Sequence, residues 1–225
     1  MAKWYHVAFY RIVYGVFWIL VRLLTRCEFY VPAQLPRKGP IIVAVNHLHV
    51  VDPAMVMLAT PFNHIAVLIG EKWAESWIVN MIVRFEGGIY VQRGEVDRKA
   101  LHQCLKVLEG GGVLGLAPEG TRSRTGVMQR AKPGVAYLAT KTNVPILPIG
   151  ISGQEKISAE WRHFRRPRIV VRVGEPFTLP PVQGRHKGEQ LQALSDMVMC
   201  RIAALVSEDL RGAYASELCK AESII

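Results

Sequence analysis

The chain has 225 residues, a length typical of one domain with a substantial hydrophobic core. Half of its residues are hydrophobic, which excludes a disordered chain, and 28 lysines and arginines against 18 aspartates and glutamates give a formal net charge of +10. This surplus favours an anionic partner, namely a phosphorylated substrate, a nucleic acid or an anionic membrane surface, without choosing among them.

The first predicted element is an N-terminal helix. Residues 12–21, IVYGVFWILV, form an uncharged apolar run between Arg11 and Arg22, shorter than the about 20 residues that a spanning helix needs. On a helix the arginines fall on one narrow stripe and tryptophans and tyrosines are frequent, which favours a helix lying in a membrane interface. Three alternatives stay open: a bilayer-spanning helix from Tyr5 to Arg26, a helix docked on the domain core, and a signal peptide.

The remainder of the chain alternates short apolar runs with amphipathic segments. The runs predicted as strands lie at 41–45, 64–70, 87–93, the start of 112–126, 144–152 and 168–174. The segments predicted as helices lie at 52–60, 72–85, 96–111, 132–142 and 188–218. This alternation predicts a layered α/β domain. We therefore divide the chain into a membrane-associating helix, residues 1–27, and an α/β domain, residues 28–225.

Prolines and cysteines add two expectations. The two prolines of VPILPIG exclude a fully paired central strand and predict a sheet edge for 144–152. The four cysteines, Cys27, Cys104, Cys200 and Cys219, include no CxxC pair, which disfavours a zinc cluster. Their scattered positions predict reduced, mostly buried thiols in an intracellular chain.

Two histidines and an aspartate stand close together in VNHLHVVDPAM. The predicted strand ends at Val45 and the next helix begins at Asp52, with Asp52 as a good N-cap. His47 therefore lies in the turn between them, where its imidazole can fold back onto the carboxylate of Asp52. Such a carboxylate fixes the tautomer and leaves the other ring nitrogen free to accept a proton, which indicates a general base. A zinc site that includes His49 and an inert polar turn are the alternatives.

Two further blocks favour an anion. Arg93 ends the predicted strand GGIYVQR, and its guanidinium fork matches a phosphate, although a single arginine is also typical of solvated surface. In PEGTRSRTG, Gly120 lets backbone amides turn toward an anion, while Thr121 and Arg122 offer direct phosphate contacts. Glu119 has two interpretations: an N-cap or ion-pair partner of Arg122, or an acceptor for a substrate hydroxyl. The loop lacks the GxxxxGK[ST] pattern of nucleotide P-loops.

The blocks in this order resemble those of the 1-acylglycerol-3-phosphate (lysophosphatidate) acyltransferases, the NHxxxxD-type glycerolipid acyltransferases. NHLHVVD, GGIYVQR, PEGTRS and VPILPIG stand in place of the four family blocks. The resemblance implies a glycerol-3-phosphate acyltransferase-like fold, a layered mixed sheet flanked by helices. It implies His47 as the base that deprotonates a glycerol hydroxyl and Asp52 as its orienting partner. The hydroxyl would attack acyl-CoA or acyl-carrier protein directly, with no covalent acyl-enzyme, metal or other cofactor.

The same resemblance implies that Arg93, Glu119, Gly120, Thr121 and Arg122 bind the acceptor and its phosphate. The expected function is transfer of a fatty acyl group to the free sn-2 hydroxyl of lysophosphatidate, giving phosphatidate. The expected setting is the cytoplasmic face of a membrane, with a lysophospholipid and an acyl thioester as partners and no nucleic acid.

Departures from the family pattern leave the acceptor open. His49 stands where many members carry serine, Gln92 where an acid is frequent, and Ala117 where an aromatic residue precedes PEG. Glycerol 3-phosphate, another lysophospholipid and a lyso-aminolipid therefore remain alternatives. The basic stretch WRHFRRPR, residues 161–168, could meet lipid headgroups, CoA phosphates or an acidic carrier protein, and an ordinary solvated surface is the alternative. A non-enzymatic basic membrane-binding protein is the alternative of a different class, and it leaves the pairing of His47 with Asp52 unexplained.

Overall fold

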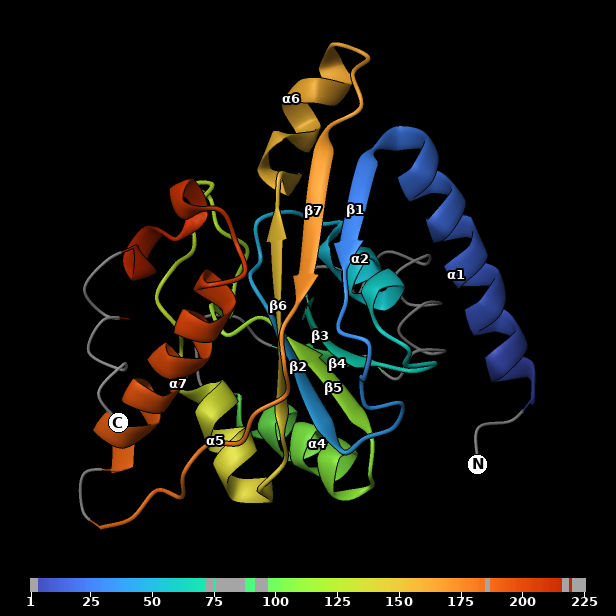
Figure 1. Cartoon of the computed structure of the whole chain (residues 1–225). Coiled ribbons are helices and arrows are strands. Elements are labelled where there is room, and N and C mark those ends of the chain that lie inside the picture. The colour runs from blue at the N-terminus through green and yellow to red at the C-terminus, as the bar shows by residue number, and fades with distance from the viewer. Residues whose placement is uncertain are drawn as a thin grey trace.

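A seven-stranded sheet with the order β1-β7-β6-β2-β5-β3-β4 forms the centre of the computed structural model (Figure 1). The structure describes residues 4–71, 75, 88–91, 97–184, 187–215 and 219, with side chains of the first helix described from Arg11 onward. The strands are β1 (Arg26–Tyr30), β2 (Ile41–Val45), β3 (Ala66–Gly70), β4 (Ile89–Val91), β5 (Val113–Leu116), β6 (Ile146–Ser152) and β7 (Arg168–Val173). Neighbouring strands pair in parallel except β6 with β7, which are antiparallel, so the sheet is mixed.

Helices cover both faces of this sheet (Figure 1). The described α-helices are α1 (Trp4–Leu24), α2 (Asp52–Ala59), α4 (Arg98–Glu109), α5 (Gly134–Thr142), α6 (Ile157–Arg162) and α7 (Lys187–Ala203). Ile42 and Ala44 of β2 pack with α4, α5 and α7, whereas Ile41 and Val43 pack with α2. Because successive strand residues point to opposite faces, burial on both sides explains why β2 is an unbroken apolar run. The prediction of a layered α/β sheet flanked by helices is confirmed, while the predicted helix 72–85 lies almost wholly outside the described residues.

β1 is a strand that the sequence analysis did not predict. It pairs in parallel with β7 along its length, from Arg26 opposite Arg168 to Tyr30 opposite Arg172. The exposed guanidinium of Arg168 donates to Glu28 from Nε at 2.8 Å and from Nη2 at 3.0 Å. β1 therefore crosses the boundary placed at residue 27 and joins α1 directly to the edge of the sheet.

β6 lies in the middle of the sheet, so the prediction of a sheet edge for 144–152 was wrong. Ile149 of β6 pairs with Val173 of β7, and Ile146 pairs with Phe177, which follows β7. Between these two pairs β6 advances by three residues and its partner segment by four, so the pairing is out of step. Pro148 falls within this step, where its carbonyl still accepts a hydrogen bond from the Gly174 N–H at 2.9 Å. A proline fits in the centre of the sheet because the ladder is already interrupted at this position.

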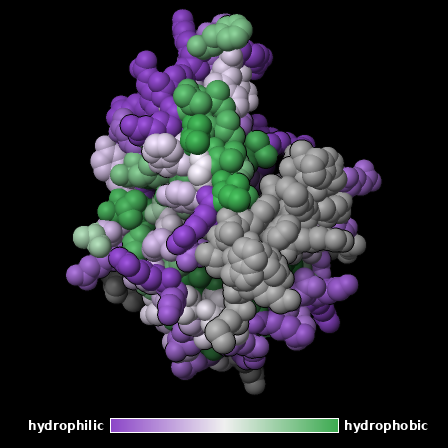
Figure 2. Space-filling model, turned by 90° about the vertical axis from the view of Figure 1, so that its right-hand side faces the viewer, coloured by the Kyte–Doolittle hydropathy of each residue, from purple (hydrophilic) through white to green (hydrophobic). Residues whose placement is uncertain are grey.

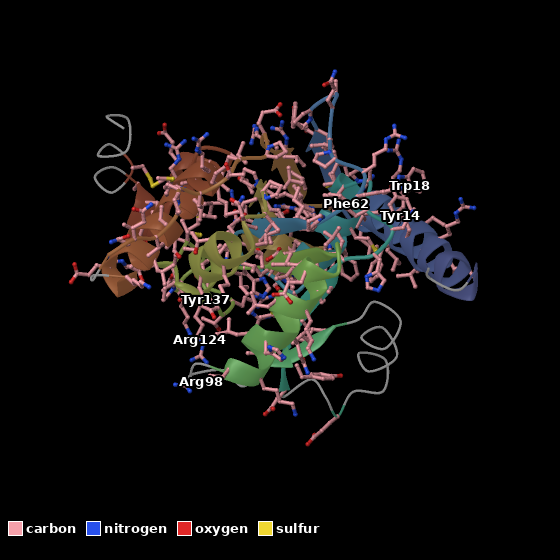
Figure 3. All side chains as sticks on the ribbon, turned by 90° about the horizontal axis from the view of Figure 1, so that it is seen from below. Tyr14, Trp18, Phe62, Arg98, Arg124 and Tyr137 are labelled. Carbon is pink, nitrogen blue, oxygen red and sulfur yellow. A yellow bond between two sulfur atoms is a disulfide. The ribbon has the colours of Figure 1, made fainter. Side chains whose placement is uncertain are left out.

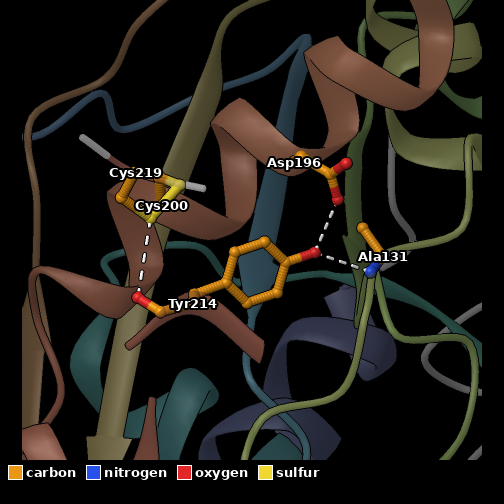
Figure 4. The surroundings of a disulfide bond; sticks show 5 residues. All are labelled: Ala131, Asp196, Cys200, Tyr214 and Cys219. Atoms are coloured by element: carbon orange, nitrogen blue, oxygen red, sulfur yellow. Dashed lines mark hydrogen bonds between the residues drawn. A yellow bond between two sulfur atoms is a disulfide. The ribbon is translucent and has the colours of Figure 1, made fainter. Parts of the chain in front are cut away.

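α7 ends at Ala203, so the prediction of one helix over 188–218 was wrong in its second half. The chain reverses, and the buried Tyr214 hydroxyl donates to Asp196 Oδ1 at 2.7 Å and accepts from the Ala131 N–H at 2.8 Å (Figure 4). In one straight helix, Cys200 and Cys219 would stand roughly 28 Å apart. After the reversal their Cα atoms are 5.4 Å apart and the two residues form a disulfide (Figure 4).

The prediction of four reduced thiols was therefore wrong for one pair. Cys27 and Cys104 are free thiols, half-buried and buried respectively. Burial, with a smaller contribution from the neighbouring Glu28, raises the pKa of Cys27 to about 12. Burial likewise raises the pKa of Cys104 to about 12. Neither thiol is a ready nucleophile near neutral pH, because the thiolate is the reactive form.

Candidate active site

The loops that follow β2 and β5 meet at the carboxyl ends of these two strands. The two strands pair in parallel, so their carboxyl ends lie side by side. The NHLHVVD segment leaves β2 at this end of the sheet and the PEGTRS segment leaves β5 there. In open α/β sheets, ligands bind at the carboxyl ends of the strands. The fold therefore brings together two blocks that lie far apart in the chain: His47 and Glu119 are separated by 72 residues.

Asn46 fastens the chain immediately after β2. It is fully buried, its Nδ2 donates to the Ile151 carbonyl at 2.9 Å, and its Oδ1 accepts from the Ile151 N–H at 2.8 Å. The carboxamide thus continues the pairing of β2 with β6 by one position. The sequence analysis missed this role, although a polar residue directly after five apolar ones was a visible signal.

His47 and Asp52 are in direct contact, as the turn between them led us to expect. The imidazole Nδ1 lies 2.8 Å from Asp52 Oδ2, with the His47 side chain 20% exposed and that of Asp52 1% exposed. Because Nδ1 faces a carboxylate, it carries the hydrogen and Nε2 keeps the free lone pair. The geometry suits a base that takes up a proton on Nε2.

Asp52 also builds the turn in which His47 lies. Its Oδ2 accepts from the backbone N–H groups of Leu48 and His49, each at 2.9 Å. The residue before the helix is Val51, which makes no side-chain cap, so the prediction that Asp52 caps α2 was wrong. The carboxylate turns back toward residues 47–49, and one acid both shapes the loop and holds the imidazole.

The PEGTRS segment clamps the backbone of His47 from both sides. Glu119 Oε1 accepts from the His47 N–H at 2.8 Å, and the Ser123 N–H donates to the His47 carbonyl at 2.9 Å. Glu119 Oε2 accepts from the Gln129 N–H at 2.8 Å. Glu119 is almost completely buried, and none of the ion pairs within the described ranges joins it to Arg122. Its carboxylate therefore positions His47, a role that the sequence analysis did not foresee.

Burial raises the pKa of Glu119 to about 7, against the opposing effect of the two N–H donors and the charge of His47. Since the folded-state pKa lies above the ordinary glutamate value of 4.5, the folded protein holds more protons between these two pH values. The stabilisation is complete below the lower value and is lost as the pH rises through about 7. We expect wild type to lose ~3 kcal/mol of unfolding free energy over this range from Glu119 alone.

Urea unfolding at about pH 5 and about pH 8 measures this loss. Other titrating groups contribute to both measurements, so the two unfolding experiments are repeated with Glu119→Gln, whose side chain cannot titrate. The loss in wild type should exceed the loss in the variant by the stated amount. Equal losses in the two proteins would show that Glu119 is ionised throughout.

The turn of the PEGTRS loop differs from the expected anion-binding arrangement. Gly120 has a φ of 71°, the left-handed region that favours glycine, but its N–H donates to the Ala117 carbonyl at 3.0 Å. A Cβ at Gly120 would lie 2.8 Å from Cδ of Lys132 and 3.3 Å from its Nζ. Lys132 therefore lies over the loop as a second cation that the sequence analysis missed. Thr121 is half-exposed and Arg122 exposed.

His49 points away from the paired residues. Its Nε2 lies 3.4 Å from Ser158 Oγ on α6. Desolvation lowers the pKa of His49, Asp52 opposes this, and the positive charges of Arg122 and His47 lower it further. The Arg122 guanidinium is therefore within electrostatic reach of the His49 imidazole. Within the described part of the chain, no three His, Cys, Asp or Glu residues form a potential metal site. Arg93 lies outside the described residues.

Residues 26–152 match the family model described as Acyltransferase, and this segment is more than half of the chain. It contains the NHLHVVD and PEGTRS segments and ends with β6. A 1-acyl-sn-glycerol-3-phosphate acyltransferase of Borreliella burgdorferi is 31% identical over 120 residues, covering 52% of this chain and 47% of that protein. The 1-acyl-sn-glycerol-3-phosphate acyltransferase alpha of Ovis aries is 30% identical over 192 residues, covering 80% and 63%.

The chain thus spans between about half and just under two thirds of the length of these two relatives. A similar solved structure is that of the 1-acyl-sn-glycerophosphate (LPA) acyltransferase PlsC from Thermotoga maritima. The likeness has a TM-score of 0.68 and covers 84% of this chain and 76% of that one. At 22% sequence identity it is a likeness of fold.

Proposed function

The chain belongs to the acyltransferase family, and we propose that it transfers a fatty acyl group from an acyl thioester to the free sn-2 hydroxyl of lysophosphatidate, giving phosphatidate. The observation that carries the proposal is the contact of 2.8 Å between His47 Nδ1 and Asp52 Oδ2 within a clamped loop. The names of the relatives from Borreliella burgdorferi and Ovis aries support lysophosphatidate as the acceptor.

In the proposed reaction, His47 Nε2 takes the proton from the acceptor hydroxyl as its oxygen attacks the thioester carbonyl carbon. The tetrahedral intermediate collapses, the carbon–sulfur bond breaks, and the imidazolium returns the proton to the departing thiolate. Asp52 stabilises the imidazolium while it exists and keeps the ring in its orientation. The two substrates and His47 account for every bond and proton, so we propose no cofactor beyond acyl-CoA or acyl-carrier protein as donor.

The acceptor phosphate is proposed to bind at the cationic side of the PEGTRS loop. Arg122 is exposed and lies near His49, and the Lys132 amine lies over Gly120. Thr121, which stands between Gly120 and Arg122 in the chain, offers a hydroxyl. A fork of guanidinium donors and a point charge suit a phosphate monoester. Arg93 joins this group by family resemblance.

Membrane association is proposed for α1. Its described outer face carries large hydrophobic side chains in the open, including Ile12 at 66%, Val16 at 50%, Ile19 at 51% and Leu23 at 65% exposure. They form a continuous hydrophobic band on this side of the molecule (Figure 2). Exposed apolar patches of this kind mark sites of interaction with membranes or proteins. No helix of the described ranges has the combination of length and hydrophobicity needed to cross a bilayer, so we propose that α1 lies in the interface.

The inner side of α1 packs on the domain. Tyr14 and Phe62 lie close together when the molecule is seen from below (Figure 3). With Arg11 they line a shallow pocket of about 230 Å³ between α1 and the segment that follows α2. Val21 packs against the core cluster that contains β2 and α2. The helix is therefore held against the domain by one side and offers its other side to a membrane.

The proposal is tested with purified protein, palmitoyl-CoA and a panel of acceptors. We expect one thiol released for each phosphatidate formed, with lysophosphatidate preferred over glycerol 3-phosphate, lysophosphatidylcholine and a lyso-aminolipid. A different preferred acceptor would reassign the substrate but keep the chemistry. Thiol release without any acceptor would indicate a thioesterase, and no release with the whole panel would favour a non-enzymatic membrane-binding protein.

A further inference from the structure

The turn between α6 and β7 has an unusual residue at its tip. The N–H of Phe164 donates to the Trp161 carbonyl at 3.0 Å, and the N–H of Arg165 donates to the Glu160 carbonyl at 2.9 Å. These two bonds form a Schellman motif, in which the residue at the Phe164 position is left-handed and is usually glycine. Phe164 has a φ of 53°. A bulky residue in this conformation is strained.

Packing within the chain does not account for the phenyl ring either. Phe164 is 99% exposed, the largest value among the exposed large hydrophobic residues of the described chain. The residue is thus unfavourable for its backbone conformation and for its contact with water. Violations of this kind concentrate where a side chain serves an interaction outside its own domain.

Arginines flank Phe164 in the chain. Arg162, Arg165 and Arg166 are all exposed, as is Arg26 at the nearby start of β1. Glu160 is the one acidic residue within residues 157–168, so the tip is strongly cationic. An exposed apolar ring among guanidinium groups is complementary to a bilayer, whose surface offers anionic headgroups directly above a hydrocarbon layer.

The tip is joined to the end of α1. Trp161 Nε1 donates to the Leu24 carbonyl at 2.9 Å, and Arg166 Nη2 donates to the carbonyls of Arg22 and of Thr25, the latter at 2.7 Å. Figure 1 shows α6 and the end of α1 at the same end of the molecule. In Figure 2 the hydrophobic band of α1 runs up to hydrophilic side chains at this end. The tip and the exposed face of α1 are therefore adjoining parts of one surface.

The other end of α6 touches the candidate active site. Ser158 Oγ lies 3.4 Å from His49 Nε2, and Arg162 Nε donates to the Ser158 carbonyl at 3.0 Å. From Ser158 to Phe164 the chain rises by no more than about 9 Å in helical geometry. A membrane contact at the tip would hold the His47 loop close to the lipid surface.

We propose that the α6–β7 turn, residues 161–166, is a second membrane contact beside α1, in which Phe164 enters an anionic bilayer and the arginines bind headgroup phosphates. The inference rests on the proposed function in one respect, because the turn would hold that active site at the membrane. The binding step itself needs no turnover.

Sedimentation with vesicles of phosphatidylcholine and phosphatidylglycerol measures the contact. Phe164→Gly should lower vesicle affinity about tenfold, the effect of withdrawing one phenylalanine from hydrocarbon. It should not lower the melting temperature, because glycine suits the left-handed position. Phe164→Trp should retain the affinity, since tryptophan is favoured at membrane interfaces. Unchanged affinity for Phe164→Gly would overturn the proposal.

The charge contribution has a matched control. Arg165→Gln should lower affinity for anionic vesicles about fivefold at low salt, with a smaller effect at high salt. Arg37→Gln removes the same charge from an exposed residue before β2, at the opposite end of the sheet, and should change affinity much less. Equal effects of the two variants would show that binding follows net charge alone and would overturn a specific contact at the turn.

Activity assays separate this inference from the proposed function. Phe164→Gly should keep the wild-type rate on a short-chain lysophosphatidate that stays monomeric, and lose about tenfold on the same headgroup embedded in vesicles. Wild type that is inactive on both substrates would contradict the proposed function while the sedimentation result still decides the membrane contact. Intact vesicle binding with weakened binding of an acidic carrier protein would assign the turn to a protein partner instead.

Discussion

Replacing His47 with alanine is expected to lower the rate of acyl transfer at least ~10²-fold, the lower end for loss of a general base. The alanine variant should remain folded, because the clamp acts on the His47 backbone: its N–H donates to Glu119 and its carbonyl accepts from Ser123. The lost rate is then attributable to the imidazole alone. The initial rate of thiol release in the presence of lysophosphatidate measures it, with the melting temperature as the check on folding.

His102→Ala is the matched control for this variant. His102 is exposed on α4, which belongs to neither of the loops that follow β2 and β5, so its removal should leave the rate within about twofold of wild type. A His47→Ala protein with the wild-type rate would remove the imidazole from the proposed chemistry. An equal fall in both variants would indicate a general effect of losing a histidine.

Replacing Asp52 with asparagine is expected to lower the same rate at least ~10²-fold while the acceptor KM changes little. An asparagine oxygen can still accept from the Leu48 and His49 N–H groups, so much of the turn is kept. It cannot stabilise an imidazolium as a carboxylate does, and its amide group can select the wrong tautomer of His47. Urea unfolding and kcat, measured on one preparation, separate the structural from the chemical effect.

Asp52→Ala provides the contrast. It removes the acceptor of two backbone N–H groups as well as the partner of the imidazole. We expect it to lower the unfolding free energy by roughly 2 to 5 kcal/mol, because the N–H groups are left without partners in a buried turn. Asp52→Asn should cost distinctly less stability at a similar loss of rate. Equal stability of the two variants would mean that the carboxylate does not build the turn.

Local patterns were sufficient to predict much of the core. The unbroken apolar run of β2 predicted a buried strand, and the Asp52–Pro53 pair predicted where α2 begins. The position of His47 between these two elements predicted its contact with Asp52, since both residues belong to one short turn. Each of these inferences uses residues that are neighbours in the chain.

Partners far apart in the chain were not predictable in the same way. Arg122, three residues away, was one of the partners considered for Glu119, but its carboxylate binds the backbone of His47, 72 residues away, and of Gln129. Asn46 binds Ile151 across 105 residues. Such contacts depend on β2 lying between β5 and β6, and strand order is not contained in the periodicity of any one segment.

The C-terminal prediction failed for a related reason. A helical pattern continues beyond Ala203, and local preference favours one helix to residue 218. The buried hydroxyl of Tyr214, with its bonds to Asp196 and Ala131, stabilises the reversed chain instead. Tertiary contacts outweighed propensity here, and the pairing of Cys200 with Cys219 followed from the reversal.

The central claim is that His47 and Asp52 act as one catalytic unit, and a double-mutant cycle tests it most directly. The kcat of acyl transfer to lysophosphatidate is measured for wild type, His47→Ala, Asp52→Asn and the double variant. If the carboxylate acts only through the imidazole, the double variant should be no slower than His47→Ala. Losses that multiply in the double variant would show two independent contributions and would contradict the claim.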